Sequence, residues 1–496
     1  MLACRPMADW RGARELPAAL GLAALLVVAR SLVFVAYEHA YLDSDQAIVG
    51  LMAKHLSEGR AFPLYFYGQT YMLGVEAWLA APWMLIAGPT VAALRLSLVL
   101  TNIAVAGLIV LLLHRGAGLR PFQALAAASF FVIAPPFTSA QLVEAQGGNV
   151  EPFLYVLLLW WLRHRPWALG AVFAIGVLNR EFTLYALPVL IAWQVASRET
   201  AWTTYVRDLL VAAIAFVCAG ELVEALLPMA DLMGPGTRGQ LVGGYAASQA
   251  VNLLERVRVE PADLAARLAA LGGRHFPAMI GGTFVDGGFS GQGRGWMGML
   301  LAAAGAAGVL RTAYLVRSRR GRADALAPAA AWYLLGIGMA AAAGYLLARP
   351  ADAPVPRYFL LALFAPIGLT ALWLAVEPAR RVRQAVLAVA CVWAAASAID
   401  NARYAERFVA GAVPNPMRAV ADALVAERIP VVRAPYWTAY ELTFLTGERV
   451  RAASTDYVRI TEYQELAERS RNPVPRLSDA PCPNGRAIAT WYLCES

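Results

Sequence analysis

Residues 17–47 read PAALGLAALLVVARSLVFVAYEHAYLDSDQA, an apolar run that passes within a few positions into a segment of acids and amides. The polar segment, Tyr41–Ala47, carries Asp43, Asp45 and Gln46. It stands out in a chain of 496 residues that is 59% hydrophobic and only 15% charged. Because soluble domains are typically about 25% charged, the composition predicts a membrane protein whose polar loops carry its chemistry.

Apolar runs continue along the chain and predict about eleven transmembrane helices, since a crossing takes about 20 apolar residues. The runs lie at 17–36, 90–113, 121–134, 149–162, 167–178, 184–196, 208–227, 296–313, 327–348, 358–376 and 383–398. Those between 121 and 196 are short for a full crossing, so we expect tilted, broken or short helices that line a cavity. The predicted fold class is therefore an all-α polytopic membrane protein.

Arginines are concentrated in the loops on one side of the predicted bundle. They precede the first run and follow the second, fourth, eighth and tenth: Arg5, Arg11, Arg14, Arg115, Arg120, Arg163, Arg165, Arg311, Arg317, Arg319, Arg320, Arg322, Arg380, Arg381 and Arg383. Short cytoplasmic loops are enriched in basic residues, so we predict a cytoplasmic N-terminus and an uncleaved first helix. Loops 37–89 and 228–295 and the tail from 399 are then extracytoplasmic. The net charge of +8 follows from this topology and indicates no nucleic-acid partner.

The tail, residues 399–496, differs from the membrane domain, residues 1–398, in its higher charge and recurrent prolines. Helices are expected at 417–427 and 436–446, and strands at 429–432, 450–453 and 487–493, which predicts a small α/β domain. The tail lacks a phosphate-binding glycine loop, so we assign it no catalysis. Cys482 and Cys494 can form a disulfide in an extracytoplasmic tail, although the sequence leaves their pairing open.

Two helices are expected in the first extracytoplasmic loop. The apolar residues of the first recur at helical spacing: Ala47, Ile48, Leu51, Met52 and Leu56. This helix would lie in the membrane interface and end at Gly59, and a second would run from 71 to 86. Asp43 and Asp45 then lie at a helix N-terminus, where one acid can cap the helix and the other can act as a general base.

The same loop resembles bacterial membrane glycosyltransferases of the GT-C fold, the superfamily of protein O-mannosyltransferases and lipid A aminoarabinose transferases. The matching segments are SDQAIVGLMAKH at 44–55, YFYGQTY at 65–71 and VEAW at 75–78, with shorter matches at 93–96, 179–181 and 356–358. The resemblance spans residues 17–398 and implies transfer of a sugar from a polyprenyl-phosphate donor to an acceptor on the outer face, usually with inversion. It implies Asp45 as the base. The family's acidic pair is Asp-Glu, whereas this chain has Gln46 in second place, and Asp43 is the candidate substitute.

A polyprenyl-phosphate donor keeps its chain in lipid and its phosphate at the interface, so a cation is needed there to stabilise the leaving phosphate. Arg357, beside Tyr358 at the start of a late span, is the first candidate, because a guanidinium grips phosphate oxygens in pairs. A membrane-anchoring arginine is the alternative. Arg180 would contact the same phosphate with Glu181 orienting it, unless both only hold a bend.

Other residues are candidates for contacts with the sugars. Tyr67, Gln69 and Tyr71 suit sugar recognition. In the tail Tyr436, Trp437 and Tyr440 suit an acceptor, although such spacing is also typical of one face of a packed helix. Glu76 and Glu151 can help to hold a divalent cation, but the spacing of the acids and histidines is not that of a metal site. A metal requirement stays open.

Two other function classes remain possible from the sequence. A transporter or flippase would explain polar residues within spans, but we find no pair of related halves. A non-catalytic polysaccharide-assembly or lipid-binding protein would share the fold with an inactive site, and Gln46 favours that alternative. The single lysine, Lys54, beside 41 arginines indicates a GC-rich bacterial source and therefore an inner membrane. The sugar and the acceptor are not identified by the sequence.

Overall fold

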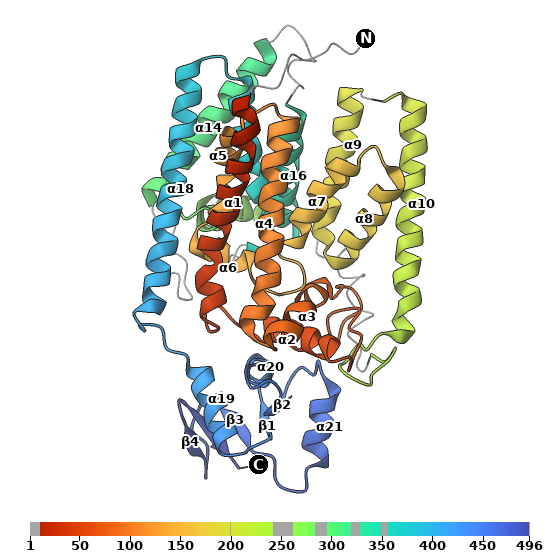
Figure 1. Ribbon diagram of the computed structural model, residues 1–496, viewed down its shortest axis with the longest axis vertical. Helices are drawn as coiled ribbons and strands as arrows, with labels where there is room; N and C mark the ends of the chain where they lie inside the picture. Colours follow the sequence, from red (N-terminus) through yellow and green to blue (C-terminus); the bar gives the residue numbers. More distant parts are fainter. Residues whose placement is uncertain are drawn as a thin grey trace.

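The computed structural model describes residues 10–198, 200–241, 261–282, 295–318, 328–348 and 356–495. A bundle of long helices is capped at one end by a small α/β domain (Figure 1). Within the described residues, five helices are long and apolar enough to cross a membrane: α1 (Trp10–Ala36), α4 (Val91–Gly116), α10 (Trp202–Leu226), α16 (Ala329–Ala348) and α18 (Arg380–Val409). The chain is therefore a multi-pass membrane protein.

The other helices of the bundle are shorter, apart from the 24-residue α14. They are α5 (Pro121–Val132), α6 (Pro136–Leu142), α7 (Glu151–Leu162), α8 (Pro166–Asn179), α9 (Ala186–Ser197), α14 (Gly295–Ser318) and α17 (Phe364–Val376), with η1 (Glu181–Tyr185), η2 (Leu227–Met229), α12 (Pro261–Ala270), η3 (Leu271–His275), α13 (Phe276–Met279), η4 (Pro356–Tyr358) and η5 (Leu360–Leu363) between them. The chain bends by 85° between α5 and α6, where Pro135 and Pro136 follow one another and neither can donate a backbone hydrogen bond. The prediction of short or broken helices between 121 and 196 is confirmed.

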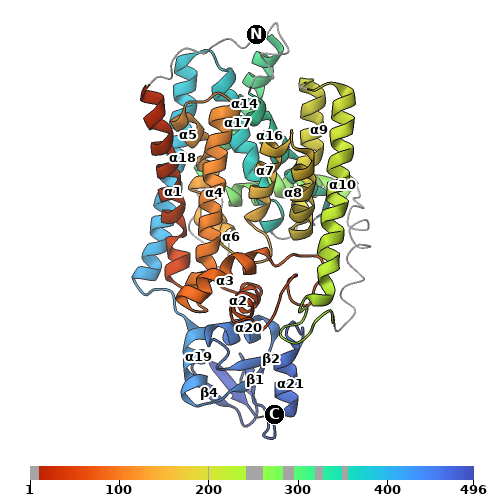
Figure 2. The ribbon, with the colours of Figure 1, turned by 45° about the vertical axis from the view of Figure 1, so that its right-hand side comes forward.

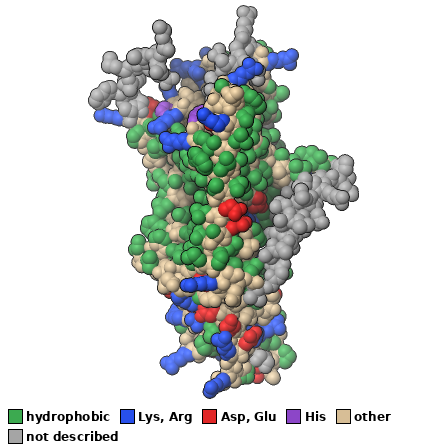
Figure 3. All heavy atoms as spheres, turned by 90° about the vertical axis from the view of Figure 1, so that its right-hand side faces the viewer, with side chains coloured by type: hydrophobic (Ala, Val, Ile, Leu, Met, Phe, Trp, Pro, Cys, Tyr) green, Lys and Arg blue, Asp and Glu red, His purple; other side chains and the backbone are tan. Residues whose placement is uncertain are grey.

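The outer surface of the bundle matches a membrane environment. Leu210, Ile214, Val217 and Leu222 of α10 are each more than half exposed. On the face drawn in Figure 3, hydrophobic side chains cover most of the middle of the molecule, apart from one group of acidic side chains, and most charged side chains lie toward its two ends. A protein in water seldom exposes so continuous an apolar surface, so lipid is the medium around these helices.

Two arginines, Arg30 and Arg95, are buried inside the bundle. Arg30 donates from Nη2 to Asn102 Oδ1 over 2.7 Å, and Arg95 donates from Nη1 to the Phe34 carbonyl over 2.6 Å. Both side chains therefore join α1 to α4. Around them, rings of α5, α7 and α17 pack with centroids 5.1 Å apart, from Phe131 to Phe153 and from Phe153 to Phe364.

The tail forms a five-stranded sheet with strand order β2-β1-β3-β5-β4. Its elements are α19 (Pro416–Ala426), β1 (Val431–Ala434), α20 (Tyr436–Leu445), β2 (Arg451–Ser454), α21 (Thr461–Arg469), β3 (Arg476–Ser478), β4 (Arg486–Ile488) and β5 (Trp491–Cys494). β1 runs parallel to β2 and β3, whereas β5 is antiparallel to β3 and β4. The predicted strand at 487–493 is in fact the β4–β5 hairpin, and α21 and β3 were not predicted.

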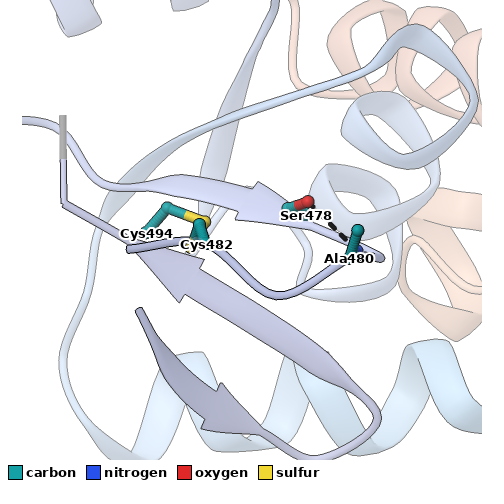
Figure 4. The surroundings of a disulfide bond; sticks show 4 residues. All are labelled: Ser478, Ala480, Cys482 and Cys494. Carbon is teal, nitrogen blue, oxygen red and sulfur yellow. Dashed lines mark hydrogen bonds between the residues drawn. A yellow bond between two sulfur atoms is a disulfide. The ribbon is translucent and has the colours of Figure 1, made fainter. Parts of the chain in front are cut away.

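Two further details of the tail bear on the sequence analysis. The Cys482–Cys494 disulfide, which the sequence left open, is formed (Figure 4). The helix α18 continues to Val409, so the expected domain boundary at 398 falls inside a helix. The tail begins after that helix, because Gly411 adopts a positive φ of 68° that ends it.

The expected helices of the first loop are α2 (Ser44–Ser57) and α3 (Val75–Ala87), which begins later than the predicted residue 71. They lie between the bundle and the tail (Figures 1 and 2). The α2 helix is not a half-exposed interfacial helix, because α20 packs against it and its polar residues Gln46 and Lys54 are buried. The α2 and α20 helices approach each other closely at Gly50, where an added Cβ would lie only 2.5 Å from the Phe444 ring of α20.

Candidate functional site

The two acids at the start of α2 have different surroundings. Asp43 is the N-cap: it has an extended backbone, and its Oδ1 accepts from the Gln46 backbone N–H over 3.0 Å. Asp45 lies in the first helical turn and is partly exposed. Burial raises the pKa of Asp43 to about 6, and the neighbouring charge of Asp45 adds to the rise. Asp43 is therefore the capping acid, which leaves Asp45 as the acid available for chemistry.

The carboxylate of Asp45 is held by a side chain from the tail. The Tyr436 hydroxyl donates to Asp45 Oδ1. The backbone of Tyr436 is fixed at both ends, because its N–H donates to Asp456 Oδ1 over 2.7 Å and its carbonyl accepts from Ser44 Oγ over 2.7 Å. Burial and the charge of Asp45 raise the pKa of Tyr436 above its usual range, so it remains a donor. The tail, which we expected to contact an acceptor but to take no part in catalysis, thus reaches the candidate base.

Gln146 lies at the centre of the site, in the loop between α6 and α7. Its Nε2 donates to Asp43 Oδ2 over 2.5 Å, and its Oε1 accepts from Arg357 Nη1. Its backbone carbonyl accepts from Arg180 Nη2 over 3.0 Å. The two candidate phosphate-binding arginines therefore meet at one residue, and within the described residues the buried Nε atom of each has no hydrogen-bond partner.

Aromatic rings line the two arginines. The guanidinium of Arg357 lies 5.2 Å from the Tyr358 ring centroid, and that of Arg180 lies 5.8 Å from the Phe182 centroid. The Phe182 and Tyr358 rings are 6.0 Å apart, edge to face. Arg357, Tyr358 and Arg180 thus lie together around Gln146 and Phe182. The prolines that precede Arg357 in the sequence lie, apart from Pro356, outside the described residues.

Glu181 is separate from this group. It is exposed in η1, and its charge acts on Tyr185. Its neighbour Arg180 is bound instead to the Gln146 carbonyl. The expectation that Glu181 orients Arg180 is therefore not supported by the contacts, because the two side chains point to different partners.

Glu76 and Glu151 lie behind the Gln146 loop. Glu76 is 1% exposed and accepts from the backbone N–H groups of Gly147 and Gly148 over 2.6 and 2.7 Å. Its carboxyl group interacts with that of Glu151, which is equally buried. Glu76 therefore holds the glycine turn that presents Gln146. Among the residues that the structure describes, no cluster of three or more histidine, cysteine or acidic side chains has the arrangement of a metal site.

Two of the candidates from the 65–71 segment differ in exposure. Tyr67 is fully buried, and its hydroxyl lies 3.2 Å from His55 Nδ1. Tyr67 is therefore a contact between α2 and the loop rather than a residue open to a sugar. Gln69 lies nearer the surface, with its amide 3.0 Å from the Tyr71 hydroxyl and 3.3 Å from the Arg459 guanidinium.

A buried ionic cluster joins the tail to α2. Glu448 accepts from Lys54 Nζ, from Arg60 Nη1 over 2.7 Å, from Tyr463 over 2.9 Å and from His55 Nε2 over 3.2 Å. Burial by itself would raise the pKa of Glu448, but the bonds to His55, Lys54 and Arg60 lower it below its usual range. The only lysine of the chain is thus part of the junction between the two domains.

Several residues of the site were not singled out from the sequence. These are Glu144, Gln146, Glu441, Glu448 and Arg459. One signal for the first two was present, since Glu144–Asn149 puts three acids or amides and a Gly-Gly pair between two apolar runs. The tail residues gave no such signal, because their partners lie nearly 400 positions away in the chain.

No protein-family model matches the sequence, and no curated protein matches it. The structure is similar to that of ArnT from Cupriavidus metallidurans bound to undecaprenyl phosphate, with a TM-score of 0.56 and 12% identity over 95% of this chain and 97% of ArnT. It is also similar to the apo oligosaccharyltransferase of Archaeoglobus fulgidus, with a TM-score of 0.51 and 14% identity over 95% of this chain and 70% of that one. Both neighbours are membrane glycosyltransferases of the GT-C fold. The fold of this chain is therefore the GT-C fold that its first loop resembles.

Proposed function

We propose that this chain is a glycosyltransferase that moves a sugar from a polyprenyl-phosphate donor to an acceptor, with Asp45 as the general base. The observation that carries the proposal is that Gln146 contacts both candidate phosphate-binding arginines and also Asp43, the acid two residues before the candidate base. The charge of Asp45 also acts on Arg357. The likeness to a protein solved with undecaprenyl phosphate supports a donor of that class.

The reaction is a single displacement. The oxygen of an acceptor hydroxyl attacks the anomeric carbon of the donor sugar while Asp45 takes the hydroxyl proton. Since Tyr436 occupies Oδ1, Oδ2 is the oxygen offered to the acceptor. The bond from the anomeric carbon to the phosphate oxygen breaks, its electron pair stays on the phosphate, and Arg357 and Arg180 stabilise that charge. Asp45 then releases its proton to water.

We place this site on the outer face of a bacterial inner membrane. The arginine-rich loops indicate that the opposite side is cytoplasmic. The disulfide of the tail supports the same orientation, because such bonds persist in oxidising compartments.

The test uses the purified protein in lipid nanodiscs with a panel of undecaprenyl-phosphate sugars and an extract of the source bacterium's envelope as acceptor. We expect release of undecaprenyl phosphate, measured by mass spectrometry, from at least one donor. Asp45→Asn should bind that donor without releasing it, and Glu465→Gln, which changes an exposed acid of α21, should match the wild type. Donor binding with no cleavage in any combination would instead favour a non-catalytic lipid-binding protein, and transbilayer movement of the intact lipid would favour a flippase.

A further inference from the structure

Exposed aromatic side chains gather where the tail meets the first loop. Among the described residues of the tail, the large apolar side chains that are exposed are Trp437 (58%), Tyr457 (53%) and Val458 (37%). On the opposite side of the junction, Tyr71 is 37% exposed. Most other exposed large apolar side chains lie on membrane helices, where lipid covers them. This group lies instead beside the candidate base.

Tyr436 connects the exposed rings to Asp45. Its ring centroid is 5.1 Å from that of Trp437 and 6.2 Å from that of Tyr457, and both contacts are edge to face. Its hydroxyl donates to Asp45 Oδ1. A molecule that lies on the two exposed rings is therefore one aromatic side chain away from the carboxylate.

The exposed rings are held in place by hydrogen bonds. The Tyr440 hydroxyl accepts from the Arg459 backbone N–H over 2.6 Å and donates to the Tyr457 carbonyl over 3.3 Å. Asp456 accepts from the Tyr436 backbone N–H. The loop that carries Tyr457 is thus fixed to the start of α20, which carries Trp437. Rings held in this way lose little entropy when a ligand binds.

Polar groups flank the rings. The Arg459 guanidinium lies 5.4 Å from the Phe66 ring centroid and 5.9 Å from that of Tyr436. The Gln69 amide lies between Arg459 and the Tyr71 hydroxyl. The exposed aromatic faces are therefore backed by the Arg459 guanidinium and by the amide of Gln69, which is 8% exposed.

We propose that this aromatic surface, made of Tyr71, Trp437, Tyr457, Gln69 and Arg459, binds a carbohydrate acceptor and directs one of its hydroxyls to Asp45. A sugar ring has a face of polarised C–H groups, which an electron-rich aromatic face attracts, and a rim of hydroxyls, which amide and guanidinium groups bind. The inference rests on the proposed function and names the acceptor class for the same site. Insertion among lipid headgroups is the alternative explanation for the exposure of these rings, but it would not explain why they contact Tyr436, which binds Asp45.

The test measures saccharide binding without any donor. Oligosaccharides are released from the source bacterium's own envelope by mild acid and are titrated into the purified full-length protein in nanodiscs, with saturation-transfer NMR as the readout. We expect the wild type to bind, and Trp437→Ala and Tyr457→Ala each to weaken binding by about tenfold. Trp437→Phe should keep most of the affinity. Trp167→Ala, which removes a 60% exposed ring of α8, is the matched control and should bind as the wild type does.

Three results would overturn the inference. The first is equal saccharide binding by the wild type and the two alanine variants. The second is binding of an envelope peptide digest but of no saccharide, which would indicate a protein acceptor. The third is quenching of Trp437 fluorescence by brominated lipids, seen as the difference from Trp437→Phe, which would make the ring a membrane anchor. Because no donor is present, saccharide binding by a protein that fails to cleave every donor would refute the proposed function alone.

Discussion

Glu448→Gln should loosen the tail from the membrane domain. Glu448 is 7% exposed and is the common acceptor of Lys54, His55, Arg60 and Tyr463. The glutamine has the same shape but no charge, so Lys54 and Arg60 lose their shared buried partner. The tail docks on α2 through this cluster, and the substitution therefore acts on the domain junction rather than on either domain alone.

The size of the effect follows from the partners that remain. Removing one partner of a buried ion pair destabilises by about 3–5 kcal/mol. Lys54 keeps Glu58, 2.8 Å away, and Arg60 keeps Glu462, 3.1 Å away, which places the loss near the lower limit. A loss of about 3 kcal/mol raises the population of the undocked state by about a hundredfold.

The single lysine gives a direct assay. Lys54 is 7% exposed beneath the tail, so an amine-acylating reagent reaches its Nζ only when the junction opens. The modification rate, followed by peptide mass spectrometry, then reports the open population as long as reclosing is faster than the reaction. We expect it to rise by about a hundredfold in Glu448→Gln. Because the pKa of Glu448 is lowered, its carboxylate stabilises the junction fully above the unfolded-state pKa of about 4.3. That stabilisation is lost only as the pH falls further, so the junction stays closed at the alkaline pH of the assay.

The matched control is Glu58→Gln. Glu58 contacts the same lysine, but it belongs to the first loop and its side chain is 39% exposed. Its loss changes the immediate surroundings of Nζ without removing a contact to the tail, so we expect a rise of only a few-fold. If the reagent modifies Lys54 at the same rate in both variants, the cluster does not hold the tail and the reasoning is wrong. The same conclusion follows if the modification rate in Glu448→Gln stays within about threefold of that in the wild type.

Four further predictions concern the site and the topology. Asp45→Asn should abolish transfer and leave donor binding intact, measured as product formation and lipid retention. Arg357→Lys should weaken donor use by about 1.5–3 kcal/mol, because an ammonium offers one point charge where a guanidinium offers two parallel bonds; near-wild-type turnover would leave a membrane anchor. Activity should fall as the pH drops through about 6, since protonated Asp43 no longer accepts two hydrogen bonds, and Asp43→Asn should remove that inflection from the pH profile. Cysteines placed at Gly236 and Ser470 should react with impermeant reagents in intact cells, and labelling only after the inner membrane is opened would reverse the topology.

Local patterns predicted much of the architecture. Helical spacing after Asp45 predicted α2, and the alternation of short helices and strands predicted most of the tail. The Asp cap predicted a difference between the two acids, which the hydrogen bond from Gln46 to Asp43 bears out. These features depend on residues only a few positions apart, so they can be predicted from a single sequence.

The contacts that assemble the site depend on distant residues. Gln146 binds Asp43 and Arg357, which lie 103 and 211 positions away, and Tyr436 binds Asp45 across 391 positions. No spacing rule reaches so far. The same limit explains the error at α2, which was expected to lie in the membrane interface, although the tail packs against it and Lys54 is buried.

The structure also bears on the argument that Gln46 marks an inactive site. Gln46 is fully buried, its Nε2 donates to the Tyr41 carbonyl over 2.6 Å, and its Oε1 accepts from Arg95 Nη2 over 3.3 Å. Tyr41 has a positive φ of 64°, an uncommon conformation that these two bonds help to hold just before Asp43. A glutamate at position 46 would lose the bond to the carbonyl and gain only a stronger pair with Arg95. The amide therefore shapes the turn that leads into α2, and the absence of a second carboxylate at this position is no evidence against Asp45 as a working base.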